Sequence, residues 1–101
     1  MYVSRMSFYT RPGHTEEVAK RLKQLADIIE RGGTRRPRVL RVSFGSPGSP
    51  DLQLEQESES LGELEHGIHS VTDREEFRSW SAGTSELLLQ VPKREVLRLE
   101  S

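Results

Sequence analysis

The sequence predicts an α+β fold of the ferredoxin-like type, in which helices cover one face of a four-stranded antiparallel sheet. Two alternating runs, at residues 38–44 and 51–59, flank the breaker-rich segment 45–50 and indicate a pair of strands. A helical pattern lies on each side of this pair, and a strand pattern lies at each end of the chain. The resulting order is strand, helix, strand, strand, helix, strand, which is that of the split β-α-β unit.

Size and composition limit what such a fold can be. The 101 residues predict a single domain over residues 1–101, and with 33% hydrophobic and 31% charged residues its core is small. A formal net charge of -1 argues against binding to nucleic acid, and no apolar run is long enough to span a bilayer. We therefore expect a cytoplasmic protein that binds neither nucleic acid nor membrane. The absence of cysteine excludes disulfides and thiolate metal sites.

The first half of the chain is predicted to form strand, helix and strand. The first ten residues alternate, which predicts a strand with Val3, Arg5 and Tyr9 on one face. His14 or Thr15 is predicted to cap the helix that follows, and an apolar stripe at spacings of three and four residues predicts one buried face. The stripe consists of Val18, Leu22, Leu25 and Ile29. Residues 32–33 are both glycine, as a left-handed C-terminal cap requires.

The strand pair at the centre of the chain has one predicted core face. We expect this face to carry Leu40, Val42, Phe44, Leu52 and Leu54, and to become polar at the end of the second strand. The opposite face of the first strand then carries Val39, Arg41 and Ser43.

The second half is predicted to contain two helices and a final strand. Residues 60–63 and 72–75 each match the capping-box spacing and predict helix starts. Leu61, Leu64 and Ile68 form the apolar stripe of the first helix, and Phe77 with Trp80 that of the second. We expect residues 82–84 to interrupt the second helix. Residues 86–91 fit a helical turn or a strand, and residues 95–100 predict the last strand.

The face of the sheet opposite the core set is predicted to meet a second copy of the chain. Its residues are a mixture of apolar and polar side chains, which is unlike a purely solvated face. We therefore predict a homodimer through sheet faces. Charges are also segregated, with five arginines and no acid at residues 31–41, and six acids and no base at residues 51–65. These charges pair either locally across strands or between two copies of the chain.

Three groups of residues resemble the dimeric α/β barrel superfamily, chiefly its NIPSNAP-like and antibiotic-biosynthesis-monooxygenase-like branches. The matching segments are residues 44–48, residues 59–65, and residues 76–80 together with 94–99. The resemblance implies two ferredoxin-like protomers with their sheets face to face. It also implies activities that range from cofactor-independent, quinone-forming oxygenation to haem degradation, and it includes proteins without assigned activity.

Several active members of that superfamily use an asparagine with a tryptophan around the cavity. This chain has no asparagine, and Trp80 is its only tryptophan, so the signature is incomplete. We expect no cofactor. The sequence predicts a protein that binds a small hydrophobic or aromatic ligand in a cavity between helices and sheet. The alternative is a cofactor-independent monooxygenase or isomerase that acts on an aromatic or polyketide-like substrate.

Candidate cavity residues are Arg5, Tyr9, Arg41, Ser43 and Trp80. Arginine can hold a carboxylate or enolate, and tyrosine can donate to an oxyanion. The alternatives are that the arginines form surface ion pairs and that Trp80 packs in the core with Phe77.

A metal site has weaker support. Glu63, His66 and His69 follow one another at three-residue steps along a predicted helix, but such steps drift around the helix axis. We therefore expect solvated side chains and no bound metal.

Overall fold

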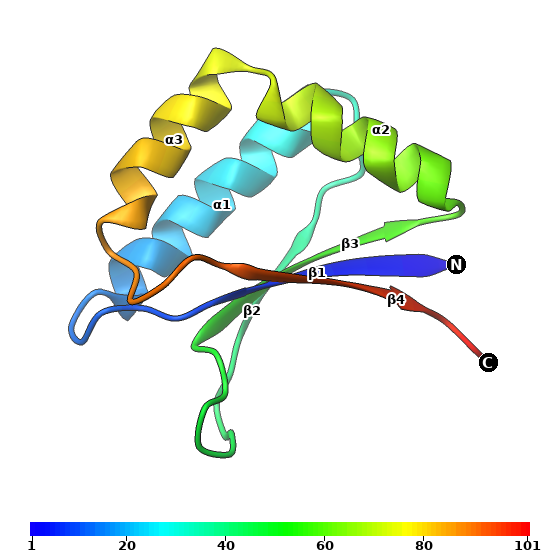
Figure 1. Cartoon of the computed structure of the whole chain (residues 1–101). Helices are drawn as coiled ribbons and strands as arrows, with labels where there is room; N and C mark the ends of the chain where they lie inside the picture. Colours follow the sequence, from blue (N-terminus) through cyan, green and yellow to red (C-terminus); the bar gives the residue numbers. More distant parts are fainter.

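A layer of three helices lies on one face of a four-stranded sheet in the computed structural model, which describes residues 1–101 (Figure 1). The predicted ferredoxin-like α+β fold is confirmed. None of the helices is long and apolar enough to cross a bilayer. In chain order the elements are β1 (Tyr2–Phe8), α1 (Thr15–Arg31), β2 (Arg38–Arg41), β3 (Leu52–Ser58), α2 (Leu61–Thr72), α3 (Glu75–Ser85) and β4 (Lys93–Arg98).

The strands follow the spatial order β2-β3-β1-β4, and every neighbouring pair is antiparallel. On the helix side, Phe8 lies opposite Leu52 in the register, and both side chains are almost fully buried. Leu54 is buried in the same way, whereas the next two positions on this face of β3 are Gln56 and Ser58. The core face of β3 therefore becomes polar towards its end, as predicted.

The face assignment predicted for β2 was wrong. Val39 lies opposite Leu54 and Arg41 opposite Leu52, so both belong to the helix side, and Leu40 belongs to the open side. The strand ends at Arg41, and Phe44 lies in the following loop with 98% of its surface exposed. Because side chains alternate, a shift of one residue moves the whole set to the other face.

Helix α1 supplies most of the core. The predicted stripe is buried against the sheet and is widened by neighbouring alanine and isoleucine side chains. Its buried members are Val18, Ala19, Leu22, Leu25, Ala26, Ile28 and Ile29. After the helix, Gly33 has a φ of 91°, which is the left-handed conformation predicted for the glycine pair.

Helices α2 and α3 differ from prediction mainly at their ends. The Ser60 side chain caps α2 by accepting a hydrogen bond from the Glu63 backbone N–H at 3.1 Å, as predicted. The second capping box was wrong, because Thr72 still belongs to α2 and Arg74 precedes α3 without a side-chain cap. The predicted interruption of α3 was also wrong. Gly83 lies inside this helix, and a Cβ there would lie 2.8 Å from the Arg21 guanidinium of α1.

The end of the chain closes the sheet. Residues 86–91 form neither a helix nor a strand; this segment turns and pairs with the chain just after β1 through an isolated bridge between Thr10 and Leu88. Strand β4 begins two residues before the predicted start and pairs with β1. No helix covers the other face of the sheet, called the open face below (Figure 1).

Candidate functional site

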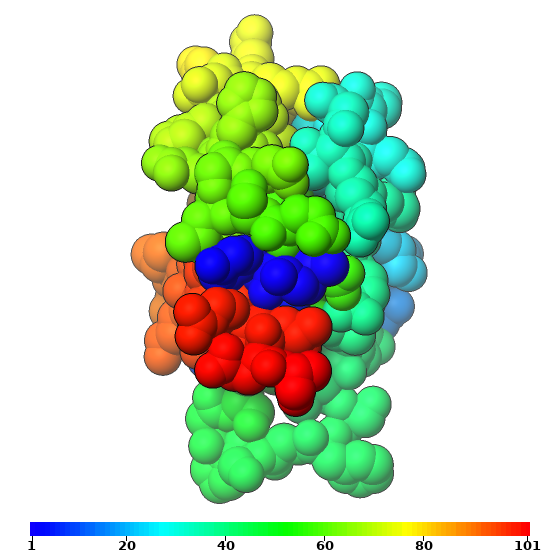
Figure 2. All heavy atoms as spheres, turned by 90° about the vertical axis from the view of Figure 1, so that its right-hand side faces the viewer, coloured from blue at the N-terminus to red at the C-terminus, as the bar shows by residue number.

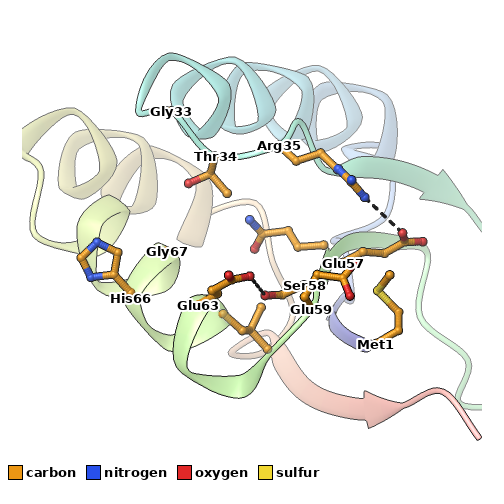
Figure 3. Close-up of a pocket in the computed structure, with 12 residues that line it drawn as sticks. Met1, Gly33, Thr34, Arg35, Glu57, Ser58, Glu59, Glu63, His66 and Gly67 are labelled. Carbon is orange, nitrogen blue, oxygen red and sulfur yellow. Dashed lines mark hydrogen bonds and ion pairs between the residues drawn. The ribbon is translucent and has the colours of Figure 1, made fainter.

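A cavity of about 320 Å³ lies on the helix side, between α2, the α1–β2 connection and the end of β3 (Figure 3). It is called the outer cavity below. Its lining is mostly polar, with two hydrophobic residues among twelve. These twelve are Met1, Gly33, Thr34, Arg35, Gln56, Glu57, Ser58, Glu59, Glu63, Leu64, His66 and Gly67. The volume lies in the range of about 300–1,000 Å³ that is typical of small-molecule pockets.

Local sequence features explain why the outer cavity exists. Gly33 turns the chain out of α1, and the Ser60 cap starts α2 directly after β3 ends. Gly67 faces the Thr34 side chain, and a Cβ added at Gly67 would lie 3.8 Å from it. A large side chain at this position would therefore fill the space between α2 and the connection.

The outer cavity has an excess of carboxylates. Arg35 pairs with Glu57 at 3.5 Å, and the Ser58 hydroxyl donates to Glu63 at 3.4 Å (Figure 3). Glu59 has no ion-pair partner. Two exposed acids therefore remain without a cationic partner, and the cavity favours a ligand that brings hydrogen-bond donors or positive charge.

A smaller apolar pocket adjoins the outer cavity, because Gln56 and Gly67 line both. It is called the inner pocket below, and its volume of about 20 Å³ is close to that of one water molecule. Its other lining residues are Met6, Leu25, Ile29, Leu54, Ile68, Val71, Thr72, Phe77 and Arg94. Side chains thus fill the centre of the space between helices and sheet.

Arg94 lies at the edge of the inner pocket and was not predicted as a site residue. It extends from β4 on the helix side, with Nη2 3.0 Å from the Met6 Sδ, and it forms no ion pair. Much of the side chain remains accessible, yet partial burial of the guanidinium lowers the pKa of Arg94. An unpaired arginine is thus available to an anionic group that approaches β4.

Two of the predicted site residues, Arg5 and Tyr9, contact different side chains. Both belong to the open face, where Arg5 pairs with Glu55 at 2.6 Å and the Lys93 ammonium lies 5.5 Å from the Tyr9 ring centroid. Glu55 also pairs with Arg38, at 2.8 Å. Its carboxylate is only 6% exposed, although no helix lies above it.

The other three predicted residues lie elsewhere. Arg41 points to the helix side and binds Glu16 at 2.7 Å, and this hydrogen bond lowers the pKa of Glu16. Its expected place on the open face was therefore wrong, because the register of β2 differs from the predicted one. Ser43 is exposed in the loop after β2. Trp80 donates from its indole Nε1 to the Arg21 carbonyl at 2.6 Å and so joins α3 to α1.

The structure does not bring Glu63, His66 and His69 together as a group of three metal-binding side chains. Glu63 and His66 line the outer cavity, whereas His69 lies 3.8 Å from Glu65 on the exposed side of α2.

The arrangement defines a ferredoxin-like protein with one open sheet face and a polar cavity under α2. Solved structures with this fold match the whole chain. A Nitrosomonas europaea protein provisionally described as an antibiotic biosynthesis monooxygenase matches at a TM-score of 0.75 and 11% identity, over 100% of both chains. An uncharacterised NIPSNAP-like domain protein from Burkholderia xenovorans matches at a TM-score of 0.78 and 16% identity, over 99% of this chain and 85% of the other.

A third match is a Bordetella bronchiseptica protein, also provisionally described as an antibiotic biosynthesis monooxygenase, with a TM-score of 0.67 and 14% identity over 97% of this chain and 96% of the other. No protein-family model matches the sequence, and no curated protein does. The chain therefore has the fold of the two branches that the sequence resemblance predicted, and at these identities the comparison shows the fold alone.

Proposed function

We propose that this protein is a homodimer that binds a small amphipathic molecule between its helices and its sheet. The observation that carries the proposal is the pair of adjoining cavities, of which the outer is polar and acidic and the inner is apolar. A ligand with a polar or cationic group at one end and an aromatic or aliphatic group at the other matches both.

Helix α2 is the element that a ligand would displace. The inner pocket is too small for an aromatic ring, so binding requires its walls to separate. Helix α2 supplies Gly67, Ile68, Val71 and Thr72 to these walls. It buries only Leu64 and Val71, whereas α1 buries seven side chains, so α2 is the less firmly held wall.

The test uses tryptamine as the probe and indole-3-propionate as its anionic counterpart. We expect tryptamine to raise the melting temperature once its concentration exceeds its dissociation constant, and the rise to follow the logarithm of the concentration. Indole-3-propionate should have a smaller effect. The reason is the excess of carboxylates around the outer cavity. Equal stabilisation by both probes, or by neither, would count against the proposed site.

A matched pair of variants on α2 locates the binding. Gly67→Leu places a large side chain between the two cavities, and Gly62→Leu makes the same replacement at an exposed position in the first turn of the helix. Both exchanges remove a helical glycine, which favours the helix by similar amounts. We expect tryptamine binding to be lost in Gly67→Leu and retained in Gly62→Leu.

The dimer is supported by the composition of the open face. Val3, Leu40 and Leu97 belong to this face with the charged residues described above, and a chain of 101 residues gains core when a second sheet covers it. The measurement is light scattering at micromolar concentration, and a monomeric mass would refute this part.

Oxygen-dependent catalysis is the second candidate, because two of the matched structures are provisionally described as antibiotic biosynthesis monooxygenases. Against it, the chain has no asparagine, and the indole N–H of Trp80 is engaged by the Arg21 carbonyl. Oxygen uptake with a hydroxyanthrone substrate distinguishes the two candidates: uptake that Gly67→Leu abolishes and Gly62→Leu leaves unchanged would favour the enzyme.

A further inference from the structure

The open face carries one row of charges that alternate in sign across all four strands. In the register, Arg38 of β2 lies opposite Glu55 of β3, Glu55 lies opposite Arg5 of β1, and Arg5 lies opposite Glu95 of β4. In the strand order β2-β3-β1-β4 the charges are therefore positive, negative, positive and negative. This set is called the charge row below.

Two-fold symmetry allows the charge row to meet its own copy in two limiting ways. When two sheets stack face to face, the symmetry axis lies in the plane between them. An axis along the strands reverses the strand order, so that β2 lies over β4 of the partner and every charge faces its opposite. An axis across the strands places each strand over its own copy, so that every charge faces its like. Electrostatic complementarity favours the first arrangement.

An exposed phenylalanine provides a second, independent observation. Phe44, 98% exposed, lies in the loop between β2 and β3, and this hairpin projects from the sheet on the side opposite the helices (Figures 1 and 2). A fully exposed phenylalanine on a projecting loop is a candidate anchor for a partner.

The apolar counterpart of Phe44 lies at the same end of the sheet but at the opposite edge. Ser7 pairs with both Gln53 and Lys93, so the end of β2 and the start of β4 are level with each other. Just before β4, Leu89 and Val91 are 61% and 82% exposed. Within one chain these two residues lie across the sheet from the hairpin. Of the two arrangements, only the one that reverses the strand order brings the hairpin beside the same residues of a second copy.

We infer that the two copies in the proposed dimer stack with reversed strand order, β2 over the partner's β4, and that Phe44 contacts the apolar segment 89–91 of the other copy. This inference rests on the proposed homodimer. The partner is a second copy because a single two-fold rotation satisfies both features. It places every charge of the row opposite a charge of the other sign, and it places Phe44 beside the apolar segment 89–91.

Cysteine cross-linking tests the orientation directly, since the chain contains no cysteine of its own. Leu40 of β2 and Lys93 of β4 lie in one row of the open face, three strand spacings apart, which is about 14 Å. In the reversed arrangement each of these residues lies at least this far from its own copy, so a bis-maleimide with a span well below that distance cannot join two copies of the same variant. Leu40→Cys and Lys93→Cys are prepared separately, mixed in equal amounts, allowed to exchange subunits and then cross-linked.

We expect the mixture to give at least a ten-fold higher yield of cross-linked dimer than either variant alone. A mixture that gives no more cross-linked dimer than either variant alone, in a protein that light scattering shows to be dimeric, would overturn the orientation and leave the dimer standing. A monomeric mass would overturn the dimer and this inference together.

The contact of Phe44 has its own measurement. Phe44→Ser is expected to raise the dissociation constant of the dimer at least ten-fold in sedimentation experiments. Leu61→Ser is the control, because Leu61 is also exposed, at 51%, but belongs to α2 on the helix side. An unchanged constant for Phe44→Ser would contradict the proposed contact.

Discussion

Trp80 joins α3 to α1, and replacing it by phenylalanine tests whether this is its role. The indole N–H donates to the Arg21 carbonyl at 2.6 Å, and the ring lies 5.8 Å from that of Phe77. Trp80→Phe keeps an aromatic ring but removes a hydrogen bond worth about 0.5–1.5 kcal/mol. The smaller ring adds about 1 kcal/mol for lost packing. At about 4–8 °C per kcal/mol, the melting temperature should fall by about 6–20 °C.

The assay is thermal unfolding followed by far-ultraviolet circular dichroism at one fixed protein concentration. Fluorescence does not serve, because Trp80 is the only tryptophan. Tyr9→Phe is the control, since the Tyr9 hydroxyl has no hydrogen-bond partner in the protein, and its effect should stay within about 0.5 kcal/mol. If Trp80→Phe lowers the melting temperature by less than about 2 °C, the indole bond does not hold α3 in place and the reasoning fails.

Three further predictions concern single positions. Arg41→Gln should raise the pKa of Glu16 towards its ordinary value, because the hydrogen bond and then the charge of Arg41 hold it down; a carboxyl NMR titration measures this, and an unchanged pKa would contradict it. Since the folded pKa is depressed, the stabilisation from Glu16 is present above its ordinary pKa and is lost as the pH falls through the folded value. Leu22→Ala, at a fully buried position of α1, should cost about 2–5 kcal/mol in urea unfolding, against less than about 0.5 kcal/mol for Leu61→Ala at its exposed position. Ser60→Ala should cost about 1 kcal/mol by removing the cap of α2, and no loss would show that the α2 start needs no side-chain cap.

The elements that the sequence predicted well are those with long periodic patterns. Helix α1 extends over 17 residues and repeats its apolar stripe several times, so both its existence and its buried face follow from the pattern. Strand β2 has four residues, too few for the alternation to define which side chains face the core. Its buried face depends on how it pairs with β3, which is a long-range choice that local pattern does not contain.

The site was less predictable because its parts come from distant segments. Glu55 binds Arg5, fifty residues away, and the outer cavity combines the N-terminus, the α1–β2 connection, β3 and α2. Only the register makes these residues neighbours. The available signal was the segregation of arginines and acids, which correctly pointed to pairing between β2 and β3.

Pairing of the segregated charges within the chain is compatible with their pairing between two copies of the chain. Arg5 and Arg38 cover the Glu55 carboxylate and leave it 6% exposed, so the ion pairs at the centre of the open face form without any partner. A second sheet would then meet charges whose positions are already set by pairing within the chain, and docking would immobilise few additional side chains. Glu95 has no ion-pair partner in its own chain, and Arg38 remains 62% exposed. The charges at both ends of the row are therefore available to a second copy. Local pairing thus organises the face, and the outermost charges of the row select the orientation of the second copy.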